Sequence, residues 1–306
     1  MMTTPKKIQI LLTLSGLTQD KLAQKLGVSF VTLNNWLNAN VVPRESAQIR
    51  IDELYKEYSG EKIISTTELS AKKNILLNKQ KSHPSLLKHI LNRVDLRDEF
   101  ILSLTYNSNS IEGSTLTEDE TASVLFDNKQ LPNKSLIEVL EAKNHQTAFQ
   151  FVLSYCSENK KISEKFILRL HEILMNSIRD DAGMYRTHGV RIVGANIPTA
   201  NYMKVPELMR NLIQEINETQ KDTVAHISKI HSIFEKIHPF SDGNGRVGRL
   251  LMHTMLLQKN FPPAMIYQES KQLYYSYLNK AQRSEDYSLL ENFLCDAVLA
   301  GFGVME

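Results

Sequence analysis

The sequence predicts an all-α protein in which a small helical module precedes a larger helical domain with one small β-hairpin flap. Apolar residues recur at helical spacing within the first sixty residues and again from Leu86 onward. Glycines and capping residues separate these periodic segments. One stretch, 183–203, instead places Val190 and Ile192 among Gly and Pro, which is typical of an extended hairpin between helices.

Composition narrows the class of protein but names no ligand. With 306 residues and 42% apolar content, the chain has enough apolar surface for one large and one small core. A formal charge of +2 provides no global field for nucleic acid or membrane, so any basic site has to be local. Cys156 and Cys295 lie far apart in apolar helical surroundings, which favours reduced thiols and a cytoplasmic location. We find no signal-peptide core and no run of membrane-spanning length, so we expect no membrane partner.

The first module, residues 1–58, has a helix-turn-helix pattern. Gly27 separates two helical segments that begin after Thr18 and Ser29. The pattern resembles repressor-like DNA-binding domains, which makes DNA an expected partner of the second segment. Its candidate base-reading positions are Phe30, Thr32, Asn34 and Asn35. Because that segment contains no Lys or Arg to contact phosphate, a module for protein contacts or dimerisation is the alternative.

The remaining chain divides into a connector and a second domain. Residues 59–94 mix Ser, Thr and Lys with isolated apolar positions, and His83-Pro84 ends any helix before it. Residues 95–306 are expected to form the helical second domain, with one of its helices around 105–113.

One loop between two apolar helical segments combines glycines with charged residues, in the order HPFSDGNGRVGR from His238 to Arg249. Gly243 and Gly245 allow successive backbone N–H groups to face one anion. The helix that begins near Arg246 adds the positive end of its dipole. Phosphate is therefore the expected ligand of the loop.

Four side chains of this loop suit phosphoryl chemistry. Asp242 is placed to hold Mg²⁺ that bridges phosphates, as a single carboxylate often does. Arg246 and Arg249 share one helical face and are placed to clamp phosphate oxygens. His238 titrates near neutral pH and is suited to accept a proton from an attacking hydroxyl.

The glycines of this loop also match a dinucleotide-binding pattern. Gly243, Gly245 and Gly248 spell G-x-G-x-x-G. That fingerprint requires a preceding buried strand and a βαβ unit, whereas here a helical segment precedes the loop. A Rossmann site is therefore not expected.

With these residues in view, the sequence resembles the Fic (filamentation induced by cAMP) family, whose motif is H-x-F-x-[DE]-G-N-G-R-x-x-R. Every specified position matches, and the resemblance runs from about Leu96 to the C-terminus. It implies a protein adenylyltransferase that uses ATP with Mg²⁺ and transfers AMP to a Tyr, Thr or Ser hydroxyl of a protein, including itself. The implied roles are His238 as base, Phe240 as anchor, Asp242 as Mg²⁺ ligand, Gly243, Asn244 and Gly245 for the α- and β-phosphates, Arg246 and Arg249 for the β- and γ-phosphates, and Val190, Ile192 and Val193 as a flap that aligns the target by strand addition.

A second match, Ser108 to Gly113, resembles the family's inhibitory motif [ST]-x-x-x-E-[GN]. It implies that Glu112, together with Ser108, reaches Arg249 and occupies the guanidinium that would receive the γ-phosphate. A merely solvated or capping glutamate is the alternative for Glu112.

Several alternatives stay open at the level of the whole protein. The chain is expected either to be this enzyme or to be a DNA-binding regulator whose second domain senses nucleotide. Transfer of UMP or phosphocholine and the removal of AMP also stay open, as do the modified target and the oligomeric state, including a homo-oligomer.

Overall fold

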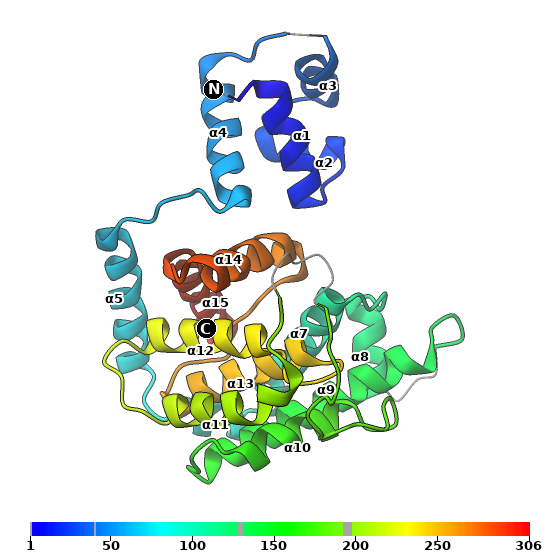
Figure 1. The fold of residues 1–306 in the computed structure, drawn as a ribbon, viewed down its shortest axis with the longest axis vertical. Coiled ribbons are helices and arrows are strands. Elements are labelled where there is room, and N and C mark those ends of the chain that lie inside the picture. The colour runs from blue at the N-terminus through cyan, green and yellow to red at the C-terminus, as the bar shows by residue number, and fades with distance from the viewer. Residues whose placement is uncertain (1, 40, 128–130, 192–197) are drawn as a thin grey trace.

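The computed structural model describes residues 2–39, 41–127, 131–191 and 198–306. Every regular element within these ranges is a helix, which confirms the predicted all-α class for the part of the chain described. Figure 1 shows two parts, an N-terminal module and a larger helical body. The two parts have separate apolar cores.

The N-terminal module packs its helices around a core of its own. Their bounds are α1 (Thr4–Ser15), α2 (Gln19–Leu26), α3 (Phe30–Asn38) and α4 (Glu45–Ser59). Thr18 and Ser29 each accept a hydrogen bond from the backbone N–H three residues later, so α2 and α3 begin at side-chain caps. Gly27 ends α2 in the left-handed conformation, at φ +69°. Leu33 and Trp36 of α3 are buried in this core.

The module rests on helix α14 (Lys271–Ser284) of the body. Leu273 packs against the core of the module, and Ser276 Oγ donates to the Tyr58 carbonyl at 2.8 Å. The contact is therefore partly apolar and partly polar.

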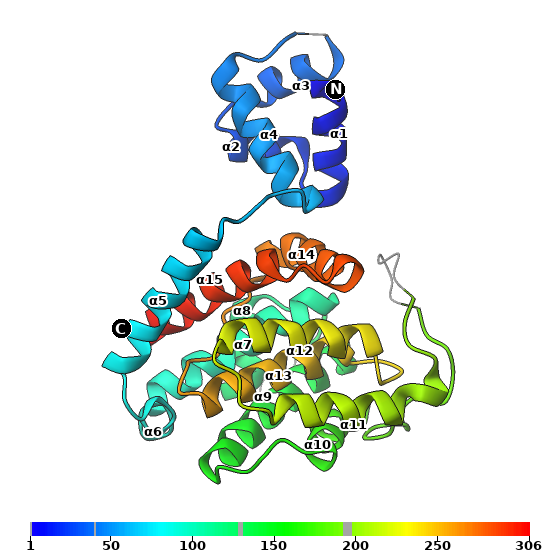
Figure 2. The same cartoon turned by 60° about the vertical axis from the view of Figure 1, so that its left-hand side comes forward.

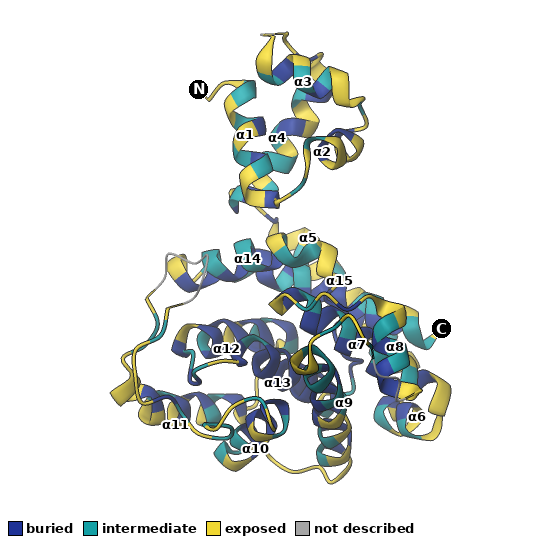
Figure 3. Ribbon diagram, turned by 90° about the vertical axis from the view of Figure 1, so that its right-hand side faces the viewer, coloured by how far each residue is buried: buried dark blue, intermediate teal, exposed yellow. Residues whose placement is uncertain are grey.

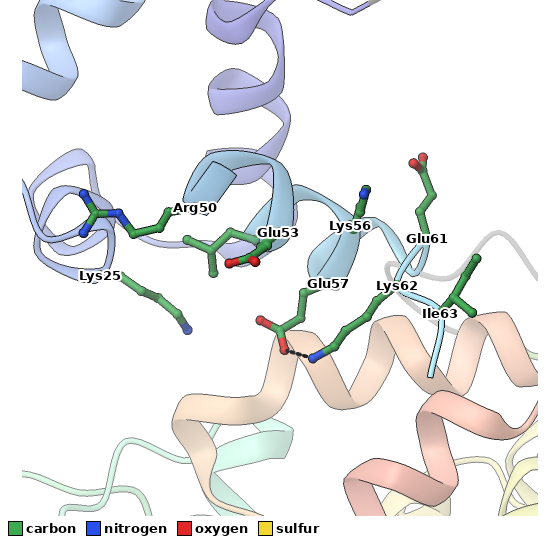
Figure 4. A pocket seen from close by; sticks show the side chains of 9 residues that line it. Lys25, Arg50, Glu53, Lys56, Glu57, Glu61, Lys62 and Ile63 are labelled. Carbon is green, nitrogen blue, oxygen red and sulfur yellow. Dashed lines mark hydrogen bonds and ion pairs between the residues drawn. The ribbon is translucent and has the colours of Figure 1, made fainter. Parts of the chain in front are cut away.

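A groove of 630 Å³ lies on the module and is lined largely by α4 and by the segment that follows α4 (Figure 4). Side chains of both signs line it, and Lys62 Nζ lies 3.3 Å from Glu57 Oε1. Because its lining residues all belong to 25–63, the groove does not include the loop singled out by the sequence.

The expected connector, 59–94, contains two helices, α5 (Thr66–Ser82) and α6 (Leu86–Asn92). Helix α5 ends just before His83-Pro84 and lies beside α15 (Ser288–Met305), as Figure 2 shows. Leu76 joins the core of the body, and Lys72 Nζ forms an ion pair with Asp296 at 2.7 Å. Much of this segment therefore packs as part of the body.

The body is built around α13 (Asn244–Gln258), which is buried along most of its length (Figure 3). It contacts four helices, α7 (Val94–Glu112), α9 (Leu136–Ser157), α10 (Glu164–Leu174) and α12 (Thr223–Ile237). The body also contains α8 (Glu118–Phe126) and α11 (Val205–Ile216), with 3₁₀ turns at Tyr202–Lys204 and Gln268–Ser270.

Helix α15 departs from the expectation that no run reaches membrane-spanning length. Its 18 residues have a mean hydropathy of 1.4, so length and composition alone would allow it to cross a membrane. Half of this stretch is buried inside the protein, where α15 packs against α5, α12 and α14. This packing is typical of a core helix, whose apolar surface faces other helices.

The predicted hairpin flap is not seen as strands in the described residues. The arms on either side of 192–197 are irregular, and Thr199 Oγ1 donates to the Val190 carbonyl at 2.8 Å. Ile192 and Val193, the other predicted flap residues, lie outside the described residues.

Trp36 is the only tryptophan of the chain, so its fluorescence reports on the N-terminal module alone. We expect Leu33→Ala to destabilise the module by about 2–5 kcal/mol, because it leaves a cavity beside buried neighbours. The measurement is urea unfolding followed by Trp36 emission. Val31→Ala on the same helix is the control, since Val31 is 64% exposed. Equal midpoints for the two variants would contradict the packing of α3.

Candidate active site

The loop between α12 and α13 is closed on itself by its own side chains. Asn244 Nδ2 donates to the Phe240 carbonyl, and Asn244 Oδ1 accepts from the Phe240 N–H, both at 2.9 Å. Phe240 is fully buried and stacks on His171 with ring centroids 3.8 Å apart. These contacts fix the loop between two helix ends.

His171 of α10 packs against this loop. Its Nδ1 accepts from the Gly183 N–H at 2.9 Å, and its Nε2 lies 3.1 Å from the Asp242 carbonyl. Because a carbonyl only accepts, Nε2 carries the proton and the ring is neutral. Burial lowers the pKa of His171 to about 4, so this arrangement holds at neutral pH. The sequence gives no signal for this contact of His171 with the loop.

His238 follows the last turn of α12, and its Nε2 makes no hydrogen bond within the described residues. Its backbone is left-handed at φ +53°, and its N–H donates to the Phe234 carbonyl. Its Nδ1 lies 3.3 Å from the Glu235 carbonyl, so Nδ1 carries the proton and Nε2 keeps its lone pair. Burial lowers the pKa of His238, and the charge of Arg186 acts in the same direction. His238 is therefore suited to accept a proton near neutral pH.

The N-terminus of α13 is the side of the site that is suited to an anion. Gly243 is left-handed at φ +76°, and the N–H groups of Asn244, Gly245 and Arg246 have no acceptor inside the helix. These donors and the helix dipole favour an anion. Asn244 was predicted to bind phosphate, but its side chain hydrogen-bonds to the Phe240 backbone. The backbone N–H of Asn244 is therefore the group left for an anion.

Asp242 lies at the open edge of this helix end. Its side chain is 55% exposed, and its Oδ1 accepts from the Gly243 N–H at 2.6 Å. No cluster of three or more His, Cys, Asp or Glu suited to a metal occurs among the described residues. One exposed carboxylate beside an anion site fits Mg²⁺, which takes its other ligands from phosphates and water.

Arg246 is buried and already has a carboxylate partner. Its Nη1 donates to Glu141 Oε1 of α9 at 2.6 Å, and its Nη2 lies 3.9 Å from Asp242 Oδ1. The ion pair with Glu141 was not expected from the sequence. It holds the guanidinium beside the helix end that Asp242 borders.

Arg249 is held by the end of α7. Its Nε donates to Ser108 Oγ at 3.0 Å, and its Nη2 donates to the Ser108 carbonyl at 3.0 Å and to Glu112 Oε1 at 2.7 Å. Burial alone would lower the pKa of Arg249, but the charge of Glu112 holds it above its ordinary value. Nη1 is buried and has no hydrogen-bond partner among the described residues.

The carboxylate of Glu112 also covers the anion-binding helix end. Its Oε1 lies so close to Gly245 that a Cβ at this position would overlap with it. One oxygen of Glu112 therefore contacts Arg249 and lies over the first turn of α13. The structure brings Ser108 and Glu112 together with loop residues more than 130 positions later in the chain.

A second carboxyl group, Glu235 of α12, is buried beside the same helix. Its Oε1 has no hydrogen-bond partner among the described residues and would overlap with a Cβ at Gly248. Burial raises the pKa of Glu235 to about 8, although Arg249 acts in the opposite direction. Glu235 is therefore a neutral acid near pH 7.

Sequence reasoning missed three residues of this site: Glu141, Arg186 and Glu235. Glu141 and Glu235 lie within periodic helices, where a glutamate usually faces solvent. Arg186, which contacts the His238 carbonyl through Nε at 2.7 Å, lies in the segment expected to be a flap. Glu141 and Arg186 have no local sequence signal, because each acts on a residue far away in the chain.

Residues 161–256, which include the loop, match the model of the Fic/DOC family. The chain is 31% identical over 189 residues to the protein adenylyltransferase Fic of Nematostella vectensis. That match covers 59% of this chain and 43% of the relative, so the chain spans less than half the length of this curated protein.

Solved structures of Fic proteins are also similar to this chain. A Fic domain containing signalling protein from Bacteroides thetaiotaomicron superposes with a TM-score of 0.67 at 25% identity, covering 76% of this chain and 94% of that one. A Fic family protein from Desulfovibrio desulfuricans gives a TM-score of 0.66 at 26% identity, covering 80% and 76%. The helical body that surrounds the His238–Arg249 loop is therefore similar in sequence and in fold to Fic domains.

Proposed function

We propose that the chain is a protein adenylyltransferase that moves AMP from Mg-ATP to a Tyr, Thr or Ser hydroxyl of a protein, and that Glu112 restrains this reaction. Relatives with this domain carry the name protein adenylyltransferase Fic. The observation that carries the proposal is the position of Glu112, whose carboxylate contacts Arg249 at an anion-binding helix end beside a histidine with a free Nε2.

In the proposed reaction, His238 Nε2 takes the proton of the target hydroxyl. The hydroxyl oxygen forms a bond to the α-phosphorus of ATP, and the bond between the α-phosphorus and its bridging oxygen to the β-phosphate breaks. Pyrophosphate leaves with that pair of electrons, and AMP remains on the protein. The free N–H groups of Asn244, Gly245 and Arg246 are the donors that stabilise phosphate charge in this step.

Asp242 and Arg246 complete the proposed polyphosphate site. Asp242 would hold Mg²⁺, which neutralises charge on the phosphates. Arg246 keeps its position through Glu141, and its Nε is buried without a partner among the described residues. Its guanidinium therefore has a donor left for a phosphate oxygen.

The restraint follows from competition for Arg249. Its Nη2 has one carboxylate partner, Glu112, and the γ-phosphate would require the same nitrogen. Glu235 does not compete while it is protonated, because a neutral acid brings no negative charge to Arg249. Withdrawal of Glu112 would leave a buried cation that favours phosphate.

The alternative role, DNA binding with the Fic domain as nucleotide sensor, concerns α3. Phe30 and Asn35 are exposed there, and Thr32 and Asn34 are half-buried and hydrogen-bonded to neighbours on the same helix. If the module binds DNA independently of transfer, His238→Ala abolishes labelling but leaves a DNA mobility shift intact.

We expect Glu112→Gly to raise self-labelling with α-labelled ATP and Mg²⁺ by roughly 10- to 100-fold, because a hydrogen bond to a charged group contributes about 1.5–3 kcal/mol. Incorporation of label is the measurement, and the mass of the modified protein after incubation with each nucleoside triphosphate identifies the transferred group.

The exposed Glu118→Gly is the matched control and should leave labelling unchanged. Adding His238→Ala to Glu112→Gly should abolish labelling. Unchanged labelling in Glu112→Gly with nucleotide binding intact would reject the inhibitory role of Glu112.

We expect Glu235→Gln to stabilise the protein increasingly as pH rises. The folded-state pKa of Glu235, about 8, lies above its ordinary value of 4.5, so the folded state keeps a proton that the unfolded state has lost. The free energy of unfolding of the parent therefore falls between these pH values, by up to about 1.4 kcal/mol per pH unit. Glutamine removes this dependence. Thermal melts at pH 5 and pH 8 measure this pH dependence of stability, with Glu118→Gln as the control. If the stability of the parent and of Glu235→Gln changed equally between these pH values, the burial of a neutral acid at Glu235 would be refuted.

A further inference from the structure

Arg186 forms an unusual junction at the edge of the active site. It is buried, and its backbone N–H donates to the Pro239 carbonyl at 3.0 Å. Within the described residues, the hydrogen bonds of its side chain all go to main-chain carbonyls. A guanidinium has five N–H donors in a fixed plane, so it can join several chain segments at one point.

Two of these bonds hold the end of α12. Arg186 Nε donates to the His238 carbonyl at 2.7 Å, and Nη2 donates to the Ile237 carbonyl at 3.3 Å. The last carbonyls of a helix have no partner within it, and a cation there also favours the negative end of the helix dipole. The residue held in this way, His238, has a left-handed backbone that is costly for any side chain other than glycine.

The other two bonds hold the described arms on either side of 192–197. Nη1 donates to the His188 carbonyl at 2.7 Å, and Nη2 donates to the Ala200 carbonyl at 2.5 Å. One guanidinium therefore contacts the chain that enters this segment, the chain that leaves it and the backbone of His238. In the part of the chain that the structure describes, no hydrogen bond of Arg186 reaches residues 241–249, where the proposed phosphate donors lie.

We propose that Arg186 is a positioning residue that couples the described arms at His188 and Ala200 to His238, the base of the reaction, so that it controls transfer and not nucleotide binding. This inference rests on the proposed function, in which His238 Nε2 takes the proton of the target hydroxyl. A displacement of either partner by about 1 Å is enough to slow such a reaction by about 100-fold.

The test uses the full chain with Glu112→Gly as parent, so that transfer is measurable. Arg186→Lys keeps the charge but loses the planar fork, and Arg186→Ala loses both. We expect Mg-ATP affinity, measured by calorimetric titration, to stay within about twofold, while self-labelling falls by about 10- to 100-fold in both variants. Arg210→Lys and Arg210→Ala on the exposed face of α11 are matched controls and should change neither quantity.

Titration of His238 by NMR supplies a readout that does not depend on transfer. The charged groups that act on His238 are Arg186, Asp242 and Glu112, and the last is absent from the parent. Loss of the Arg186 charge should raise the pKa of His238 in Arg186→Ala, whereas Arg186→Lys should leave it near that of the parent. The acid limb of the labelling rate should move to higher pH in step with this pKa.

The outcomes separate the two proposals. If nucleotide affinity and labelling fall in parallel, or if neither labelling nor the His238 titration responds to Arg186→Ala, the coupling role is wrong. If the parent transfers no label but the His238 pKa rises in Arg186→Ala alone, the adenylyltransferase proposal fails and the contact with His238 stands. Should Arg186→Ala not fold, Arg186→Lys decides through the ratio of labelling to affinity.

Discussion

The site depends on the ion pair and hydrogen bonds of one buried group, the guanidinium of Arg249. A charge removed from water is stable only where other groups replace its lost hydration. The end of α7 supplies them, because Ser108 accepts through both its hydroxyl and its carbonyl, and Glu112 adds the countercharge. These acceptors lie on one turn of one helix, so they also fix α7 against α13. The same contact therefore balances the charge and places a carboxylate over the anion-binding helix end.

Three buried titratable groups near Arg249, namely His231, His253 and Glu235, are uncharged at neutral pH. Burial lowers the pKa of His231 and His253 to about 3 and raises the pKa of Glu235 to about 8. In each case the apolar surroundings of α12 and α13 disfavour the charged form. Glu112 is consequently the carboxylate that decides whether Arg249 is balanced from within the protein. A polyphosphate that replaced it would meet a cation already desolvated, where electrostatic attraction is stronger than in water.

How far the sequence predicts this site depends on whether its signals are local. The loop 238–249 is contiguous, and the end of α7 carries a second short motif, so both were identified before the structure. Glu141 and Arg186 were not, because an ion pair between distant helices and bonds to main-chain carbonyls leave no pattern in the chain.

The same limit applies to the predicted hairpin flap. The alternation around Val190 indicates strands, but in the described arms the carbonyls accept from Arg186 and Thr199, where a hairpin ladder would require opposing backbone N–H groups.

The three glycines of the loop show why a pattern needs its structural context. Each leaves room for a different side chain: a Cβ would overlap with Met175 at Gly243, with Glu112 at Gly245 and with Glu235 at Gly248. In a dinucleotide fold the same spacing serves a strand, a pyrophosphate and a packed helix. Here the three glycines allow the loop to pack on Met175 after α10, Glu112 to approach α13, and Glu235 to be buried beside it. Two of the three glycines, Gly245 and Gly248, therefore leave room for carboxyl groups that flank α13, and a substitution at either position would displace one of these groups.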